Sequence, residues 1–350
     1  MKALVTGASG FVGSALCRAL TEAGHHAVGL TRDPERARAR VPAEVELVRG
    51  GVGLPKDVAA AAKGCEVIFH AAGLAPGAAP QRVLRWLHVA GTENVVRAAR
   101  HSGARRVVHM SCAEVSLHAG DRMHWDEVRV LPHAPLGAHA QSKLMSEELA
   151  LAQSDHRLQV TALRPALLWG EGAFDSLASL VREGRERGLQ LYGGGRNIVA
   201  TTHIGNLARA ALLAADAEAA PSRAYYVTDA EFLEAREFFG KLSQALGLPA
   251  PRLDGNLGLA LVLARVKESL GGDAGAARAR LLVRAKSALF DLSRATKDLG
   301  YAARLDLNQA MEELARWVRE AGGAEGLLRQ ARGPVSERDV DEQVQAAGGD

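Results

Sequence analysis

The chain has 350 residues, of which 47% are hydrophobic and 24% charged, so it is long enough to bury a core in one large domain or two closely packed ones. The formal net charge is +3 and basic residues are interleaved with acidic ones, which argues against a nucleic-acid partner. Three widely spaced cysteines make no disulfide framework, and this favours a reducing, cytoplasmic location.

The first thirteen residues predict a nucleotide site. Residues 2–5 form a short apolar run, and residues 6–13 read TGASGFVG, a glycine-rich turn that opens a helix. Gly7 permits the tight turn, Gly10 lets backbone N–H groups approach a pyrophosphate, and Gly13 lets the helix pack closely on the strand. The anion would then lie at the positive end of the helix. This order of strand, loop and helix predicts a dinucleotide-binding fold.

The rest of the first half alternates between strand and helix patterns. The helix that opens at the glycine-rich turn stops near Gly24. Further strands are expected at 26–31, 45–48, 66–70, 106–110, 159–163 and 224–227. Helices are expected at 81–101 and 141–153, where apolar residues recur at helical intervals. The alternation predicts an α/β fold, a doubly wound parallel Rossmann sheet with helices on both faces.

The pattern also predicts how the chain is divided. Residues 1–165 are expected to form the dinucleotide-binding Rossmann domain, and residues 166–330 a smaller, mostly helical substrate-binding region interleaved with it. Residues 331–350 are polar and are expected to be a flexible tail. The apolar run 257–264 ends at an arginine and is too short for a transmembrane segment.

Six separated segments share one pattern. The segments are TGASGFVG at 6–13, HAAG at 70–73, HVAGTENVVRAA at 88–99, VVHMSCAEV at 107–115, HAQSK at 139–143 and LRPALLWG at 163–170. Together they resemble the extended short-chain dehydrogenases/reductases, which include sugar epimerases, dihydroflavonol-type reductases and 3β-hydroxysteroid dehydrogenase-like enzymes. The resemblance implies an NAD(P)-dependent oxidoreductase acting on a hydroxyl or carbonyl of a small lipid-like or sugar-nucleotide substrate.

The resemblance also assigns the catalytic positions. In this family a tyrosine and a lysine four residues apart lie on one helix face, where the ammonium group lowers the phenol pKa and holds the nicotinamide ribose. A serine at the end of the neighbouring strand orients the substrate oxygen. Here the lysine is Lys143, but His139 stands at the tyrosine position. The serine position falls on Ser111 or Cys112, and Cys112 matches it better because Val115 follows three residues later.

The cofactor residues follow from the same segments. Arg32 comes directly after the second strand, where an arginine accommodates the 2′-phosphate of NADP and an acid would favour NAD. NADP is therefore the preferred cofactor and NAD the second choice. The full set implied by the resemblance is Gly7, Ser9, Gly10, Phe11, Val12, Gly13, Arg32, Val52, Ala71, Ala72, Gly73, Lys143 and Pro165.

The altered catalytic positions leave three interpretations open. His139 could replace tyrosine as the acid or base, because imidazole titrates near neutral pH. Alternatively, the chain binds NAD(P) without redox turnover, as a sensor or a partner of another enzyme. A third possibility is an elimination or isomerisation on the same scaffold. The resemblance also implies a homodimer through the helices at 81–101 and 141–153.

No metal is expected, although three metal-competent side chains should converge. His88, His139 and Cys112 would meet if the family geometry holds. Their spacing matches no compact ligand motif, and no carboxylate obviously completes the set.

Overall fold

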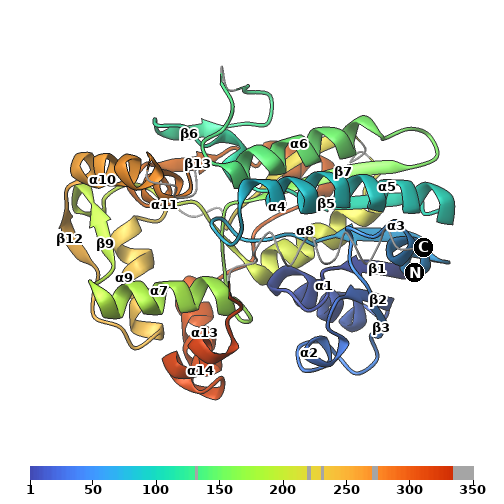
Figure 1. Cartoon of the computed structure of the whole chain (residues 1–350), viewed down its shortest axis with the longest axis horizontal. Coiled ribbons are helices and arrows are strands. Elements are labelled where there is room, and N and C mark those ends of the chain that lie inside the picture. Colours follow the sequence, from blue (N-terminus) through green and yellow to red (C-terminus); the bar gives the residue numbers. More distant parts are fainter. Residues whose placement is uncertain (131–132, 219–221, 230–231, 270–274, 334–350) are drawn as a thin grey trace.

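The computed structural model describes the chain apart from residues 131–132, 219–221, 230–231, 270–274 and 334–350 (Figure 1). A seven-stranded sheet crosses the larger part of the molecule in the order β11-β7-β5-β4-β1-β2-β3. Every neighbouring pair in it is parallel. The strands are β1 Lys2–Thr6, β2 His26–Thr31, β3 Glu46–Arg49, β4 Val67–His70, β5 Arg106–Met110, β7 Gln159–Pro165 and β11 Arg223–Val227.

Helices cover both faces of this sheet. One layer contains α3 Pro55–Ala62, α5 Gly91–Ser102 and α6 Ala138–Ala152; the other contains α1 Phe11–Glu22, α8 Ile204–Asp216 and α12 Ser293–Leu299. Successive side chains of a strand point to opposite faces, so Leu4 packs into the first layer while Ala3 and Val5 pack into the second. The doubly wound Rossmann fold predicted from the sequence is confirmed.

Two predicted helices differ in detail from the observed ones. The single helix expected at 81–101 is interrupted: α4 Gln81–Arg85 passes into a π-helical turn at Trp86–Ala90 before α5 begins. The helix expected at 141–153 begins earlier, at Ala138, after Gly137 with φ 92°. His139 therefore lies in the first turn of α6, one turn before Lys143.

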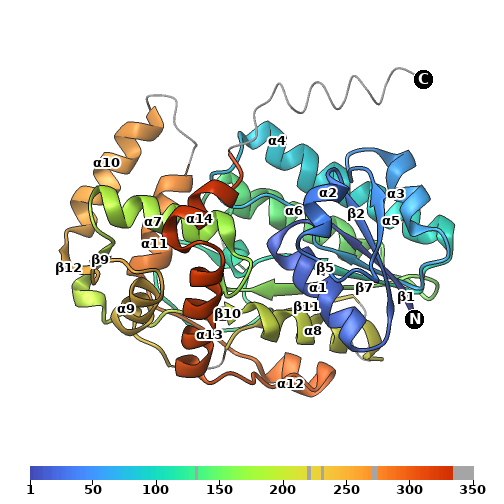
Figure 2. The same cartoon turned by 90° about the horizontal axis from the view of Figure 1, so that it is seen from below.

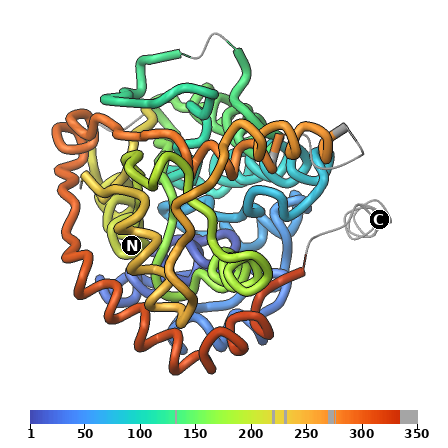
Figure 3. The backbone as a smooth tube through the Cα atoms, turned by 90° about the vertical axis from the view of Figure 1, so that its left-hand side faces the viewer, coloured from blue at the N-terminus to red at the C-terminus, as the bar shows by residue number. Residues whose placement is uncertain are grey.

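The remaining elements form a second packed region (Figures 1 and 3). An apolar cluster there draws its buried residues from between Trp169 and Leu327. This region, expected to be mostly helical, also contains short strands. The strands are β8 Leu167–Trp169, β9 Gln190–Tyr192, β10 Thr201–His203 and β12 Arg252–Gly255, and the helices are α7 Phe174–Glu186, α9 Ala235–Ala245, α10 Leu257–Ser269, α11 Ala276–Ala285, α13 Leu307–Glu320 and α14 Gly323–Gln330.

The remaining elements are short. They are the helix α2 Pro34–Arg38, the 3₁₀ turns η2 Ala113–Ser116 and η3 Gly193–Gly195, and the paired strands β6 Arg122–Trp125 and β13 Ala288–Phe290. Among the described residues, no helix combines the length and the apolar character needed to cross a bilayer. The three cysteines are all free thiols.

The segment expected to be a flexible tail begins in contact with the N-terminal domain. An Arg332 guanidinium N–H donates to Ser9 Oγ over 2.8 Å, so this part of the segment is held against the glycine-rich loop. The rest of the predicted tail, residues 334–350, lies outside the described residues.

Candidate active site

The sheet has its switch point between β1 and β4, because β2 and β3 continue from one side of β1 and β5 from the far side of β4. In such sheets the crevice at the carboxyl ends of the strands is the ligand site. Thr6 and His70 end the two strands opposite each other. The Thr6 hydroxyl accepts the Ala72 N–H over 3.1 Å and lies 2.9 Å from His70 Nδ1.

The glycine-rich loop is packed as a dinucleotide requires. Gly7 has φ +71°, and its N–H donates to the Leu30 carbonyl. A Cβ at Gly7 would lie 2.8 Å from Ala72 Cα, and one at Gly13 would lie 2.2 Å from the Gly7 carbonyl oxygen. The loop is thus compact enough to bring the open N–H groups of the first turn of α1 to the crevice, which fits a pyrophosphate.

The predicted cofactor residues outside this loop come together at the same edge of the sheet. Arg32 follows β2, and its methylene groups lie 3.7 and 3.9 Å from where a Cβ of Gly51 would be. Ala71, Ala72 and Gly73 follow β4, Val52 follows β3, and Pro165 ends β7. These residues are in place for a dinucleotide laid across the carboxyl ends of the strands.

Lys143 lies inside this edge. Its side chain is buried, and its Nζ donates to the Met110 carbonyl at the end of β5 over 2.8 Å. A Cβ at Gly73 would lie 3.2 Å from that Nζ. Burial lowers the pKa of Lys143, and nearby acidic groups, Glu114 and Glu147 among them, partly offset this effect. Gly73 therefore leaves the space through which the ammonium group faces the crevice.

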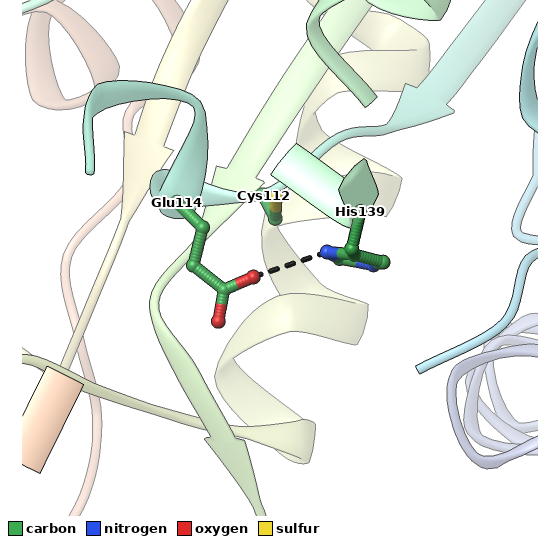
Figure 4. Close-up of side chains that lie close together, drawn as sticks. All are labelled: Cys112, Glu114 and His139. Carbon is green, nitrogen blue, oxygen red and sulfur yellow. Dashed lines mark ion pairs between the residues drawn. The ribbon is translucent and has the colours of Figure 1, made fainter. Parts of the chain in front are cut away.

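His139 faces a carboxylate that the sequence analysis did not single out (Figure 4). Its Nδ1 atom lies 3.2 Å from Glu114 Oε2, in the 3₁₀ turn that follows β5. Burial on its own would raise the pKa of Glu114, but the neighbouring His139 and Arg122 bring that pKa below its ordinary value. Glu114 is thus ionised beside the imidazole ring.

The two candidates for the serine position offer different groups, a thiol and a buried hydroxyl. Burial and the charge of Glu114 raise the pKa of the Cys112 thiol far above its ordinary value, so Cys112 is a neutral thiol. The Ser111 hydroxyl is buried and has no hydrogen-bond partner among the described residues. The Cys112 Sγ atom lies within 4.8 Å of a ring nitrogen of His139.

The structure adds a carboxylate to the metal-competent set. One ligand atom from each of Cys112, Glu114 and His139 lies within 4.8 Å of the others, so Glu114 occupies the place for which the sequence offered no candidate. The Lys143 ammonium group interacts electrostatically with both Cys112 and Glu114, and its positive charge disfavours a cation there.

His88 lies in the π-helical turn and is a neutral donor. Its Nε2 accepts the Leu74 N–H over 3.2 Å, which leaves Nδ1–H to donate to Ser142 Oγ at 2.9 Å. Burial and the Lys143 charge hold its pKa well below the ordinary value. Its ring meets that of His139 edge-on, with centroids 5.5 Å apart. His88 therefore links the π-helical turn to α6 by its hydrogen bond to Ser142, and its ring packs against that of His139.

A buried ion pair fixes α6 on the sheet. The Arg164 guanidinium on β7 donates to both carboxylate oxygens of Glu147, at 2.6 and 3.0 Å. The Glu147 side chain is almost fully buried, with 1% exposed. Since Glu147 lies one helical turn after Lys143, the pair holds the helix face that carries Lys143 and His139.

Known proteins resemble this chain in sequence. The model of the NAD dependent epimerase/dehydratase family matches residues 3–227. The chain is 35% identical over 268 residues to the 2-alkyl-3-oxoalkanoate reductase of Stenotrophomonas maltophilia (strain K279a), covering 73% of this chain and 78% of that protein. It is 28% identical over 333 residues to the 4-hydroxy-2-methyl-3-oxo-4-farnesyl-3,4-dihydroquinoline-1-oxide ketoreductase of Stigmatella aurantiaca, covering 93% and 97%.

A solved structure agrees over nearly the whole chain. The complex of MoeE5 with UDP-glucose and NAD superposes with a TM-score of 0.71 at 25% identity, covering 92% of this chain and 100% of that one. It places an NAD-bound enzyme on the fold described above.

Proposed function

Because the chain belongs to the NAD-dependent epimerase/dehydratase family of extended short-chain dehydrogenases/reductases, we propose that it reduces a ketone on a lipid-like substrate and that the Glu114–His139 pair replaces the tyrosine. The observation that carries this proposal is the 3.2 Å separation between Glu114 Oε2 and His139 Nδ1. A carboxylate beside one ring nitrogen orients the imidazole and stabilises its protonated form, as in hydrolase triads.

The residues of this chain divide the work as follows. When bound, the nicotinamide supplies the hydride. Lys143 binds the nicotinamide ribose and places a positive charge near the reacting oxygen. Since Glu114 faces Nδ1, the Nε2–H of protonated His139 is the group left to donate a proton to that oxygen. His139 then becomes neutral and regains its proton from solvent, and Glu114 acts as a positioning residue.

The named relatives favour a lipid-like substrate over a sugar nucleotide. Two relatives are named as reductases of substrates that carry an alkyl or farnesyl group and an oxo group, which supports the same class.

NADP is the proposed cofactor in preference to NAD. The support is Arg32, which follows β2 and extends over Gly51, with no carboxylate at either position to bind a ribose 2′-hydroxyl. The division at residue 165, the homodimer through 81–101 and 141–153, and the cytoplasmic location are proposed on the sequence grounds given above. The three free thiols agree with a reducing compartment.

The test is turnover with a 3-oxoalkanoate and NADPH, measured as the loss of the absorbance of reduced nicotinamide. We expect reduction by the parent and formation of the hydroxy product in equal amount. Tight NADPH binding without oxidation across a panel of ketones would favour the cofactor-binding protein without redox turnover. Multiple turnovers of a substrate with the cofactor still oxidised would favour elimination or isomerisation.

A further inference from the structure

The segment after α14 reaches the glycine-rich loop from the far end of the chain. Arg332 donates from its guanidinium to Ser9 Oγ over 2.8 Å and to the Ser9 carbonyl over 3.4 Å. The same Ser9 Oγ accepts the Thr31 hydroxyl at 3.0 Å, and Thr31 is the last residue of β2. The Ser9 hydroxyl thus links Arg332 to Thr31 at the end of β2. The adenosine ribose of a dinucleotide binds at this end of the strand.

This segment is held in place on two sides (Figure 2). The Arg332 N–H donates to Asp175 Oδ1 in the first turn of α7 over 2.6 Å. Arg36, in α2, donates to the Gln330 carbonyl at 2.7 Å. These two hydrogen bonds, one to α7 and one from α2, hold the backbone at Arg332 and Gln330, and the Arg332 side chain is directed to the loop.

Positive charge accumulates around Ser9 without a matching number of acids. Arg40 donates to the Ser9 carbonyl at 3.2 Å and lies over the Phe174 ring at 4.4 Å. Burial, followed by the charges of Arg36 and Arg32, lowers the pKa of Arg332, and Asp175 and Asp33 offset this only in part. The Asp33 carboxylate also caps α2, where it accepts the Arg36 N–H. Guanidinium groups packed this closely are repulsive unless an anion joins them.

We propose that Arg332, with Arg32 and Arg36, binds the 2′-phosphate of NADP(H), so that the segment after α14 completes the cofactor site. This inference rests on the proposed function. A phosphate with two negative charges matches the excess of guanidinium groups, and arginine binds phosphate oxygens through paired N–H donors. Ser9 Oγ supplies a further hydrogen-bonding group at the same place.

The test is calorimetric binding to the full chain of adenosine 2′,5′-bisphosphate and 5′-AMP, which differ only in the 2′-phosphate. NADPH and NADH are measured in parallel. The variants are Arg332→Ala and Arg332→Gln, and the matched control is Arg319→Ala, an exposed arginine of α13. We expect both Arg332 variants to bind the bisphosphate and NADPH about tenfold more weakly. Binding of 5′-AMP and NADH should be unchanged, and the control should match the parent.

Other results would overturn the inference in distinguishable ways. An equal loss for NADPH and NADH would make Arg332 a structural tie only. A parent that binds NADH and NADPH equally, with no effect of the Arg332 variants, would overturn this inference and leave the proposed reductase intact. A parent that binds neither dinucleotide would overturn both.

Discussion

His139 Nδ1 lies 3.2 Å from Glu114 Oε2, across the gap between the first turn of α6 and the 3₁₀ turn after β5. The family resemblance implies a tyrosine at this helix position, with a lysine that sets its acidity. Here an imidazole faces a carboxylate instead. We propose that this pair takes over the role of the tyrosine in proton transfer.

Glu114→Gln should therefore lower kcat about 10- to 100-fold and leave NADPH affinity unchanged, because an amide orients the ring without stabilising its charge. We also expect the alkaline limb of the kcat profile to move to lower pH. Steady-state kinetics across pH measures both effects. A variant with the parent's profile would show that Glu114 has no part in proton transfer.

Chelation should not affect turnover. The donors of Cys112, Glu114 and His139 are close enough together for an ion, but the nearby Lys143 ammonium group favours the proton-transfer interpretation. Dialysis against EDTA is expected to leave kcat intact, with no zinc found by elemental analysis. Activity that disappears on dialysis and returns with stoichiometric Zn²⁺ would make the cluster a metal centre.

Lys143→Met should separate stability from function. Burial lowers the pKa of Lys143, so the folded state disfavours its ammonium form relative to the unfolded chain. Below the folded-state pKa of Lys143, the buried ammonium group lowers the free energy of unfolding by a constant amount. This loss of stability becomes smaller as the pH rises from the folded-state pKa toward the pKa of the lysine in the unfolded chain. The variant is expected to have a higher Tm at pH 7 but at least ~100-fold lower kcat. A lower Tm with retained turnover would contradict the assignment.

Buried histidines should make the fold sensitive to acid. Burial, then the charge of Lys143, lowers the pKa of His70 to about 3, while the unfolded chain protonates it near its ordinary value. Between these two pKa values the unfolded state thus binds more protons than the folded state. The contribution of the neutral histidine to the free energy of unfolding is therefore fully present above the pKa of the unfolded chain, and it is lost as the pH falls below that value.

Each such histidine contributes a slope of about 1.4 kcal/mol per pH unit within that window. His70→Gln should reduce the slope of unfolding free energy against pH by that amount, measured by urea unfolding between about pH 4 and 6. The exposed His133→Gln is the control and should keep the parent's slope. An unchanged slope in His70→Gln would mean that His70 is charged in the folded protein.

The fold was predictable because strand and helix periodicities alternate and the glycine spacing is specific. The positions of Lys143 and His139 on one face follow from helix geometry alone. Glu114 was not predictable in the same way, because its side chain reaches the site from a 3₁₀ turn that no periodicity marks. The segment 107–115 did contain it, two positions after Cys112, and this was the available signal.

Two other features depend on tertiary contacts rather than local pattern. The π-helical turn at Trp86–Ala90 shifts the register of one helix and turns His88 toward α6, yet its residues have ordinary helical spacing. Arg332 belongs to a polar segment whose composition indicates a flexible tail. Its contact with Ser9 spans most of the chain, and a separation of that kind leaves no trace in sequence spacing.

The most direct test of the central claim is single-turnover reduction of a 3-oxoalkanoate by His139→Phe, compared with His139→Tyr. The account predicts that the phenylalanine variant binds NADPH like the parent but transfers hydride at least ~100-fold more slowly, and that tyrosine restores much of the rate. If His139→Phe oxidises NADPH as fast as the parent, the imidazole is not the proton donor and the Glu114–His139 pair has no catalytic role.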